Sequence, residues 1–265
     1  MRALAEMDKA YCALASWMTL TAESSNSIPT LVLVMPITTF LIVIGILNVP
    51  FWLHLSTTSP TPSTPKGKRL RNDFTAFMTV PLRLMQLCFW LHAAAESLSI
   101  LSSMGIIPLA TSEYLLLPDG HFVSISPLRA AAGLAVILGG FLRWRCFREM
   151  GAHFTFHVTV LEKHKLITTG PYAYVRHPSY SGGVLIDLGL WPWLFLPGSW
   201  ATESSISASP WFWLVLAPCL TFGVTVVPMI FGRIKAEDEI LMKQFGKEWE
   251  KWAKDVPYRL IPGVY

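Results

Sequence analysis

The sequence predicts an all-α integral membrane protein with about five transmembrane helices. Of its 265 residues 52% are hydrophobic and only 14% are charged, and its mean hydropathy is +0.46. Such a composition is typical of a chain that crosses a membrane several times. A helix needs about 20 mostly apolar residues to cross about 30 Å of hydrocarbon. Candidate stretches occur at residues 31–55, 81–109, 127–147, 183–197 and 210–232.

The first three stretches belong to an N-terminal part of the chain, residues 1–142. Its first twenty residues contain no uninterrupted apolar run, and three charged residues lie within positions 6–9. A signal peptide needs a clean apolar core, so we expect an interfacial helix or a frayed terminus instead. A linker over residues 56–80, which begins with a Ser, Thr and Pro-rich segment, joins the first two stretches.

The last two stretches form a predicted helical hairpin over residues 183–232. The first of them, GVLIDLGLWPWLFLP, is short and contains Asp187 and Pro192. An acid and a proline both weaken a spanning helix, so this half of the hairpin is expected to be tilted or broken. The hairpin belongs to a C-terminal part of the chain, residues 143–265, in which we expect the chemistry to lie.

The distribution of Lys and Arg predicts the orientation in the membrane. The loops after the first and third stretches carry several basic residues, and those after the second and fourth carry none. Positively charged loops stay in the cytoplasm, so the C-terminus and the segment before the hairpin are expected there. The net charge of +4 is spread over membrane-adjacent loops. We therefore expect contact with lipid headgroups and no nucleic-acid partner.

Several polar or reactive residues lie within the apolar stretches. Three of the four cysteines do so, and none has Cys-x-x-Cys spacing, so neither a metal site nor a disulfide framework is predicted. Glu96 and Asp187 are costly in a membrane and invite a functional explanation. A hydrogen bond to a neighbouring helix explains either residue about as well, and both alternatives stay open.

The segment before the hairpin carries an Arg-His-Pro motif. The preceding residues, GAHFTFHVTVLEKHKLITTGPY, alternate β-branched and aromatic side chains and end near Gly170-Pro171. This pattern predicts irregular or short extended structure, which protein or a polar cavity must cover at membrane depth. Arg176, His177 and Pro178 follow directly. Taken alone, such residues at a span boundary more often contact headgroups than a ligand.

A second polar segment follows the hairpin. Leu241, Phe245, Trp249 and Trp252 recur every three or four residues, which predicts one apolar face of a C-terminal helix over residues 233–254. We expect this helix to lie at the membrane interface. Arg233 and Glu237 begin the same segment. Since they are four residues apart, they share a helical face and could pair or both contact a ligand.

Together, the two segments resemble the isoprenylcysteine carboxyl methyltransferase family. The resemblance is carried by HxLITTGPYxYxRHPSYxG, a hydrophobic hairpin, RxxxE, Phe-Gly and VPYRLIPG, in this order over about residues 143–264. It implies an integral membrane enzyme that uses S-adenosylmethionine to methylate the C-terminal carboxylate of a prenylated cysteine. Members reside in the endoplasmic reticulum in eukaryotes. The implied partners are a prenylated protein C-terminus or a small prenylcysteine-like substrate, and membrane lipids.

The resemblance also implies individual site residues. Arg176, Arg233 and Glu237 would act beside the reacting groups, with one arginine orienting the substrate carboxylate and Glu237 holding the cofactor's ammonium or hydroxyl groups. Asp238 stands where many relatives have a second glutamate, so its role stays open. In the same comparison His177 would donate to the cofactor carboxylate, and two tyrosines would wall the pocket. The implied cofactor-binding set is His164, Leu166, Tyr172, His177, Pro178, Tyr180, Gly182 and Glu237.

Other functions share parts of this pattern. The acceptor could be a small prenylated or terpenoid acid, or a phospholipid amine, which would need a general base. Membrane sterol reductases that use NADPH share the RHP-x-Tyr-x-Gly region and the VPYR ending, although the RxxxE spacing favours the methyltransferase. A non-catalytic membrane scaffold would need neither polar segment.

Overall fold

The computed structural model confirms an all-α protein, with one short strand pair besides the helices in the part of the chain that it describes. It describes residues 37–58, 67–69, 74–106, 117–118, 121–151, 159–161 and 165–265, so the expected N-terminal interfacial segment and part of the linker lie outside the described residues. The chain divides into two units, residues 1–42 and 43–265, and the contacts below belong to the second. The described elements are α2 (Ile37–Thr57), β1 (Gly67–Arg69), α3 (Phe74–Ser103), α4 (Pro127–Met150), β2 (Thr159–Leu161), η2 (Gly170–Ala173), α5 (Pro178–Phe195), α6 (Trp200–Glu203), η3 (Ser205–Ala208), α7 (Pro210–Phe245) and α8 (Lys247–Asp255).

Three of the described helices are long and apolar enough to cross a membrane: α3 over Thr79–Ser103, α4 and α7. They make the chain an integral membrane protein, but they do not account for all five expected spans. The apolar part of α2 is shorter, and α5 begins with the polar and glycine-rich PSYSGG. Large apolar side chains such as Leu134 and Val224 are exposed, as expected of surfaces that face lipid.

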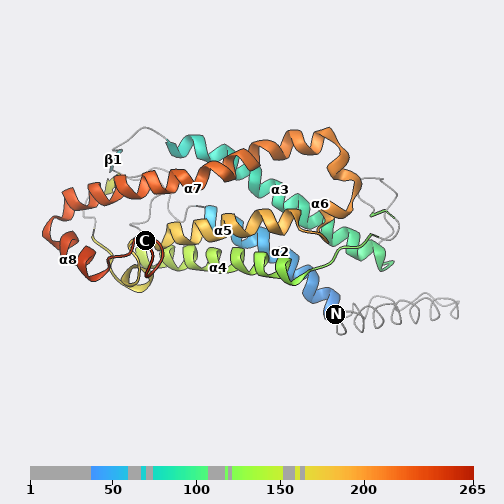
Figure 1. Ribbon diagram of the computed structural model, residues 1–265, viewed down its shortest axis with the longest axis horizontal. Helices are drawn as coiled ribbons and strands as arrows, with labels where there is room; N and C mark the ends of the chain where they lie inside the picture. The colour runs from blue at the N-terminus through green and yellow to red at the C-terminus, as the bar shows by residue number, and fades with distance from the viewer. Residues whose placement is uncertain are drawn as a thin grey trace, which may run out of the picture. The chain divides into compact units, whose positions relative to one another are not determined.

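Glycines let α5 lie close against α4, and Figure 1 shows the two helices side by side. A Cβ atom on Gly139 would lie 2.6 Å from the carbonyl oxygen of Gly182, and one on Gly182 would lie 2.7 Å from that of Gly139. Small residues permit this close backbone approach between membrane helices. Because α5 begins at Pro178, the contact places the Arg-His-Pro motif at one end of α4.

Helix α7 extends well beyond a single membrane crossing. Its 36 residues give a length of about 54 Å, against about 30 Å of hydrocarbon. Residues 233–245 continue α7, so the prediction of one separate helix over 233–254 is wrong. The break comes at Gly246, whose φ of 51° lies in the left-handed region that glycine adopts readily. The C-terminal part of α7, residues 233–245, carries Arg233 and Glu237 away from the apolar part of the helix.

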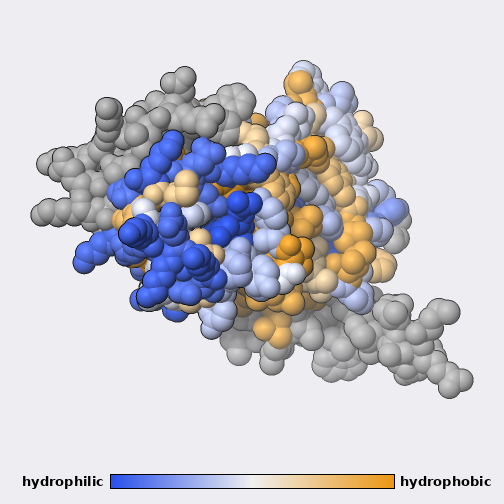
Figure 2. All heavy atoms as spheres, turned by 60° about the vertical axis from the view of Figure 1, so that its left-hand side comes forward, coloured by the Kyte–Doolittle hydropathy of each residue, from blue (hydrophilic) through white to orange (hydrophobic). Residues whose placement is uncertain are grey.

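The apolar stripe predicted for that single helix is divided between α7 and α8. Trp252 of α8 is buried and packs with Cys146 and Tyr172, and Trp249 packs against the same cluster. This face of α8 therefore contacts protein, where an interfacial helix was expected to contact lipid. Figure 2 shows hydrophilic residues gathered at the end of the molecule that carries α8, and hydrophobic residues over the neighbouring surface.

A buried ion pair joins the helices at the other end of this unit. Arg129, in the first turn of α4, and Glu96 of α3 are fully buried, and Arg129 Nη2 donates to the Glu96 carboxylate. Arg129 Nε donates to the carbonyl oxygen of Trp193 at 3.1 Å. That carbonyl has no helical partner four residues later, because Pro197 lacks an N–H. Arg129 thus completes the hydrogen bonding at the end of α5.

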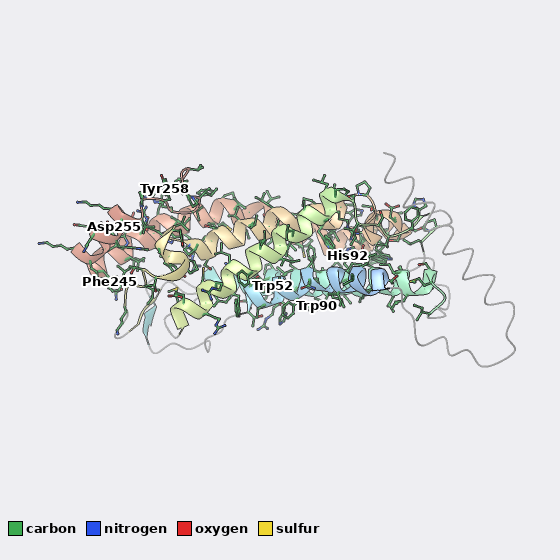
Figure 3. The ribbon with its side chains drawn as sticks, turned by 90° about the horizontal axis from the view of Figure 1, so that it is seen from below. Trp52, Trp90, His92, Phe245, Asp255 and Tyr258 are labelled. Carbon is green, nitrogen blue, oxygen red and sulfur yellow. The ribbon has the colours of Figure 1, made fainter. Side chains whose placement is uncertain are left out.

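Glu96 also joins a further element to this pair. Its carboxylate accepts a hydrogen bond from the backbone N–H of Trp200, the first residue of α6, at 3.3 Å. Of the two explanations for an acid inside an apolar stretch, a bond to neighbouring helices is therefore the one observed. His92, one turn away on α3, lies on the other side of the middle of Figure 3 from Asp255 and Tyr258.

The expected short extended structure is found in β2, which pairs antiparallel with β1 so that Lys68 lies opposite Val160. The pair connects the linker after α2 with the segment before η2. Most residues between α4 and β2 lie outside the described residues, as does His164.

Candidate active site

The Arg-His-Pro turn and the C-terminal segment are joined through their backbones. The N–H of Arg176 donates to the carbonyl oxygen of Tyr258, and the N–H of His177 donates to that of Arg259, both at 2.9 Å. The Ser181 hydroxyl adds a bond to the carbonyl oxygen of Leu260 at 2.6 Å. Two motifs about eighty residues apart in the sequence therefore form one structure.

Asp238 connects this structure to α7. Its Oδ1 lies 2.9 Å from His177 Nε2, and its Oδ2 accepts from Arg259 Nε at 3.0 Å. Arg176 Nη2 lies 3.5 Å from the same Oδ2. A carboxylate only accepts hydrogen bonds, so this single buried acid of α7 can hold donors from both the Arg-His-Pro turn and the C-terminal segment. Its position next to Glu237 was the only sign of this role in the sequence.

Tyr180 connects Arg233 with Glu237. Its hydroxyl donates to Glu237 Oε2 at 2.7 Å and accepts from Arg233 Nε at 2.7 Å. Its ring also stacks on His177, with 5.8 Å between ring centres. The arginine and the glutamate of the RxxxE motif therefore face the turn that precedes α5.

The expected cofactor residues divide into two groups in the structure. His177, Tyr180 and Glu237 meet in the polar cluster, although His177 Nε2 faces Asp238, where a donor to the cofactor was expected. Leu166 and Tyr172 lie in the neighbouring apolar cluster with Trp252.

The remaining expected residues have structural surroundings of their own. Pro178 is buried at the start of α5, and Gly182 faces α4. Arg143 of α4 donates through Nη1 to the carbonyl oxygen of Ser179 at 2.9 Å, and through Nε to that of Ser56 at 2.9 Å. The first turn of α5 is thereby attached to both α4 and α2.

Burial shifts two ionisable groups beside the polar cluster. It raises the pKa of the Tyr172 phenol well above its ordinary value, so this hydroxyl remains protonated, and it donates to Met150 Sδ at 2.9 Å. Burial also lowers the pKa of the Arg176 guanidinium, although Asp238 acts in the opposite direction. A buried cation with a lowered pKa is a group that an anion would stabilise.

The cluster has an excess of positive charge. Three guanidinium groups face two carboxylates, which leaves a formal charge of +1 before any charge on His177 is counted. Such a site can hold an anionic group through the arginines and a cationic or hydroxyl group through the glutamate. The five charged members are Arg176, Arg233, Arg259, Glu237 and Asp238.

Replacing Asp238 with asparagine is expected to loosen the whole cluster. The amide keeps the size of the side chain but presents an N–H to groups that are themselves donors. We expect a loss of about 1 to 3 kcal/mol in unfolding free energy, and faster hydrogen exchange at the N–H groups of Arg176 and His177. Asp255→Asn on the exposed side of α8 is the control. Unchanged exchange at both amides would contradict the role of Asp238.

Comparison with known proteins agrees with the family resemblance. Residues 131–214 match the model of the isoprenylcysteine carboxyl methyltransferase family. Protein-S-isoprenylcysteine O-methyltransferase B of Arabidopsis thaliana is 32% identical over 124 residues, which cover 46% of this chain and 53% of the relative. The protein-S-isoprenylcysteine O-methyltransferase of Schizosaccharomyces pombe is 30% identical over 123 residues, 45% of this chain and 44% of the relative.

A second group of relatives has a different activity. A Delta(14)-sterol reductase of Schizosaccharomyces pombe is 33% identical over 101 residues, which cover 38% of this chain but only 20% of the reductase. The aligned region thus spans about half the length of the two methyltransferases and a fifth of the reductase.

Proposed function

We propose that this chain, which matches the isoprenylcysteine carboxyl methyltransferase family over residues 131–214, transfers a methyl group from S-adenosylmethionine to the C-terminal carboxylate of a prenylated cysteine. The observation that carries the proposal is the hydrogen-bonded series of Arg233, Tyr180 and Glu237 beside the Asp238-held turn. It brings the two polar segments of the family pattern into one site.

The residues of this site suit S-adenosylmethionine, which carries a carboxylate, an ammonium group and ribose hydroxyls. Glu237 would hold the ammonium or a hydroxyl, and the arginine-rich side of the cluster would hold the carboxylate. Arg176 fits this role, because its Nε is buried without a hydrogen-bond partner in the described structure. When bound, the cofactor supplies an electrophilic methyl group on sulfur.

The chain's own residues would contribute chiefly by positioning. A C-terminal carboxylate has a pKa of about 3.5 and is ionised at neutral pH, so no general base is needed. Holding both reactants at attack distance can supply about 7 to 11 kcal/mol. The planar guanidinium of Arg233 or Arg176 would orient the acceptor carboxylate, and the Tyr180 hydroxyl holds Nε of Arg233 in place.

A prenylated acceptor also explains a site beside membrane helices. At about 0.8 kcal/mol per buried CH₂, a farnesyl chain of about fifteen carbons strongly prefers lipid, so it would enter between helices from the bilayer. The basic loops and C-terminal segment support a site on the cytoplasmic side of the membrane. The family resemblance extends the proposal to the endoplasmic reticulum membrane. A small terpenoid acid would satisfy the same chemistry.

The reductase relatives support sterol reduction as an alternative function. One set of binding and activity measurements tests this alternative against methyl transfer. The purified full chain is expected to bind labelled S-adenosylmethionine and to methylate N-acetyl-S-farnesylcysteine. Binding of NADPH without S-adenosylmethionine, together with reduction of a sterol that has a C14 double bond, would overturn the proposal. Transfer to phosphatidylethanolamine but not to the farnesylated acid would reassign the acceptor to a lipid amine.

A further inference from the structure

Two buried hydrogen-bond donors beside the polar cluster have no partner in the described structure: Arg176 Nε and Trp249 Nε1. The Arg176 side chain is only 9% exposed. Its guanidinium carbon lies 5.8 Å from the centre of the Trp249 ring, so the two side chains are neighbours. Buried N–H groups are almost always bonded in native proteins, and an unsatisfied one calls for an explanation.

Asp238 faces Arg176 through Nη2 and leaves Nε without a bond. Its Oδ1 is already engaged with His177 at 2.9 Å and its Oδ2 with Arg259 at 3.0 Å, while Arg176 Nη2 lies 3.5 Å away. The edge of the guanidinium that carries Nε has a donor with no acceptor among the residues that the structure describes. This edge is the one through which arginine often binds carboxylates with two parallel bonds.

Trp252, on the same helix as Trp249, has a hydrogen-bond partner for its indole N–H. Its Nε1 donates to the carbonyl oxygen of Tyr172 at 3.3 Å, and its ring is buried in the apolar cluster. Trp249, three residues earlier, packs against that cluster too, but its N–H has no such bond. An indole nitrogen can only donate, so the missing partner must be an acceptor.

We propose that Arg176 and Trp249 form a subsite that binds a carboxylate group, an inference that rests on the proposed function. A carboxylate is the acceptor that both donors lack, and it would offset the positive excess of the cluster. Leu166 and Tyr172, which the family resemblance places around the cofactor, pack in the same apolar cluster as Trp249. The carboxylate belongs either to the methionine part of the cofactor or to the prenylated acceptor.

The test is Trp249→Phe in the full chain, which keeps an aromatic ring and removes the N–H. Trp252→Phe is the matched control, because it removes an N–H that bonds to the protein. Two ligand pairs distinguish the sources of the carboxylate. One is S-adenosylhomocysteine with its decarboxylated analogue, and the other is N-acetyl-S-farnesylcysteine with its amide.

Trp249→Phe is expected to weaken binding of the carboxylate-bearing member of one pair by about tenfold to a hundredfold, and to leave its carboxylate-free partner unchanged. An effect on the first pair assigns the group to the cofactor, and an effect on the second assigns it to the acceptor. Trp252→Phe should lower thermal stability without changing either ratio.

Equal effects on both members of a pair, or no effect on any ligand, would overturn the subsite. If the unmodified chain methylates the farnesylated acid and Trp249→Phe binds all four ligands normally, only the subsite fails. If the unmodified chain binds NADPH and none of the four ligands, the proposed function fails and the subsite fails with it.

Discussion

Replacing Glu237 or Arg233 with alanine is expected to reduce methyl transfer by at least about a hundredfold, the loss typical of removing a group that stabilises charge at a reacting centre. The two side chains are joined by the Tyr180 hydroxyl, 2.7 Å from each. Glu237→Ala removes the acceptor of that hydroxyl and the proposed partner of the cofactor's ammonium group. Arg233→Ala removes the guanidinium that the hydroxyl holds in place.

The measurement is initial-rate transfer to N-acetyl-S-farnesylcysteine, with membrane insertion and thermal stability followed in the same preparations. Glu239→Ala is the matched control, because this residue lies two positions after Glu237 on α7 and is exposed. Near-normal rates in both Glu237→Ala and Arg233→Ala would refute their roles.

Tyr180→Phe offers a graded version of the same experiment. It keeps the ring that stacks on His177 but removes the hydroxyl that connects the arginine with the glutamate. We expect a loss of about tenfold, since one hydrogen bond disappears while both charged groups remain. A loss as large as that of Glu237→Ala would mean that the phenol contacts the reacting groups itself.

The sequence indicated which residues of the candidate site lie together, but not all of the hydrogen bonds that connect them. The family pattern named Arg233, Glu237 and Tyr180 as candidates, and in the fold the Tyr180 hydroxyl is hydrogen-bonded to each of the other two. Asp238 could not be assigned, because an acid beside Glu237 on a helix reads equally well as solvated surface. Its role depends on Arg259, which only the folded C-terminal segment brings back to α7.

Composition was enough to predict an all-α membrane protein. The ends of the helices and their close contacts depend on backbone conformation and on single glycines, which hydropathy does not reveal. The periodic stripe from α7 into α8 continues across Gly246, so pattern alone joined two helices that a positive φ separates. The close contact of Gly139 with Gly182 likewise has no hydropathy signal, since a glycine at a helix contact and an exposed glycine score alike.

Arg129→Ala is expected to destabilise the protein by about 3 to 5 kcal/mol, the cost of removing one partner of a buried ion pair. The Glu96 carboxylate would keep no guanidinium partner, and the Trp193 carbonyl oxygen at the end of α5 would lose the donor that compensates for Pro197. Unfolding in detergent or bilayers measures this change. Arg145→Ala on the same helix, where the side chain is exposed, is the control.

A paired substitution separates the charge effect from a simple loss of packing. Because burying both charges is itself costly, Glu96→Leu combined with Arg129→Met should lie closer to the unmodified protein in stability than Arg129→Ala does. The carbonyl oxygens that Arg129 serves would remain unbonded in the double variant, so recovery should be incomplete. A double variant at least as unstable as Arg129→Ala would show that the bonds from Arg129 to the ends of α4 and α5, and not its pairing with Glu96, hold these helices together.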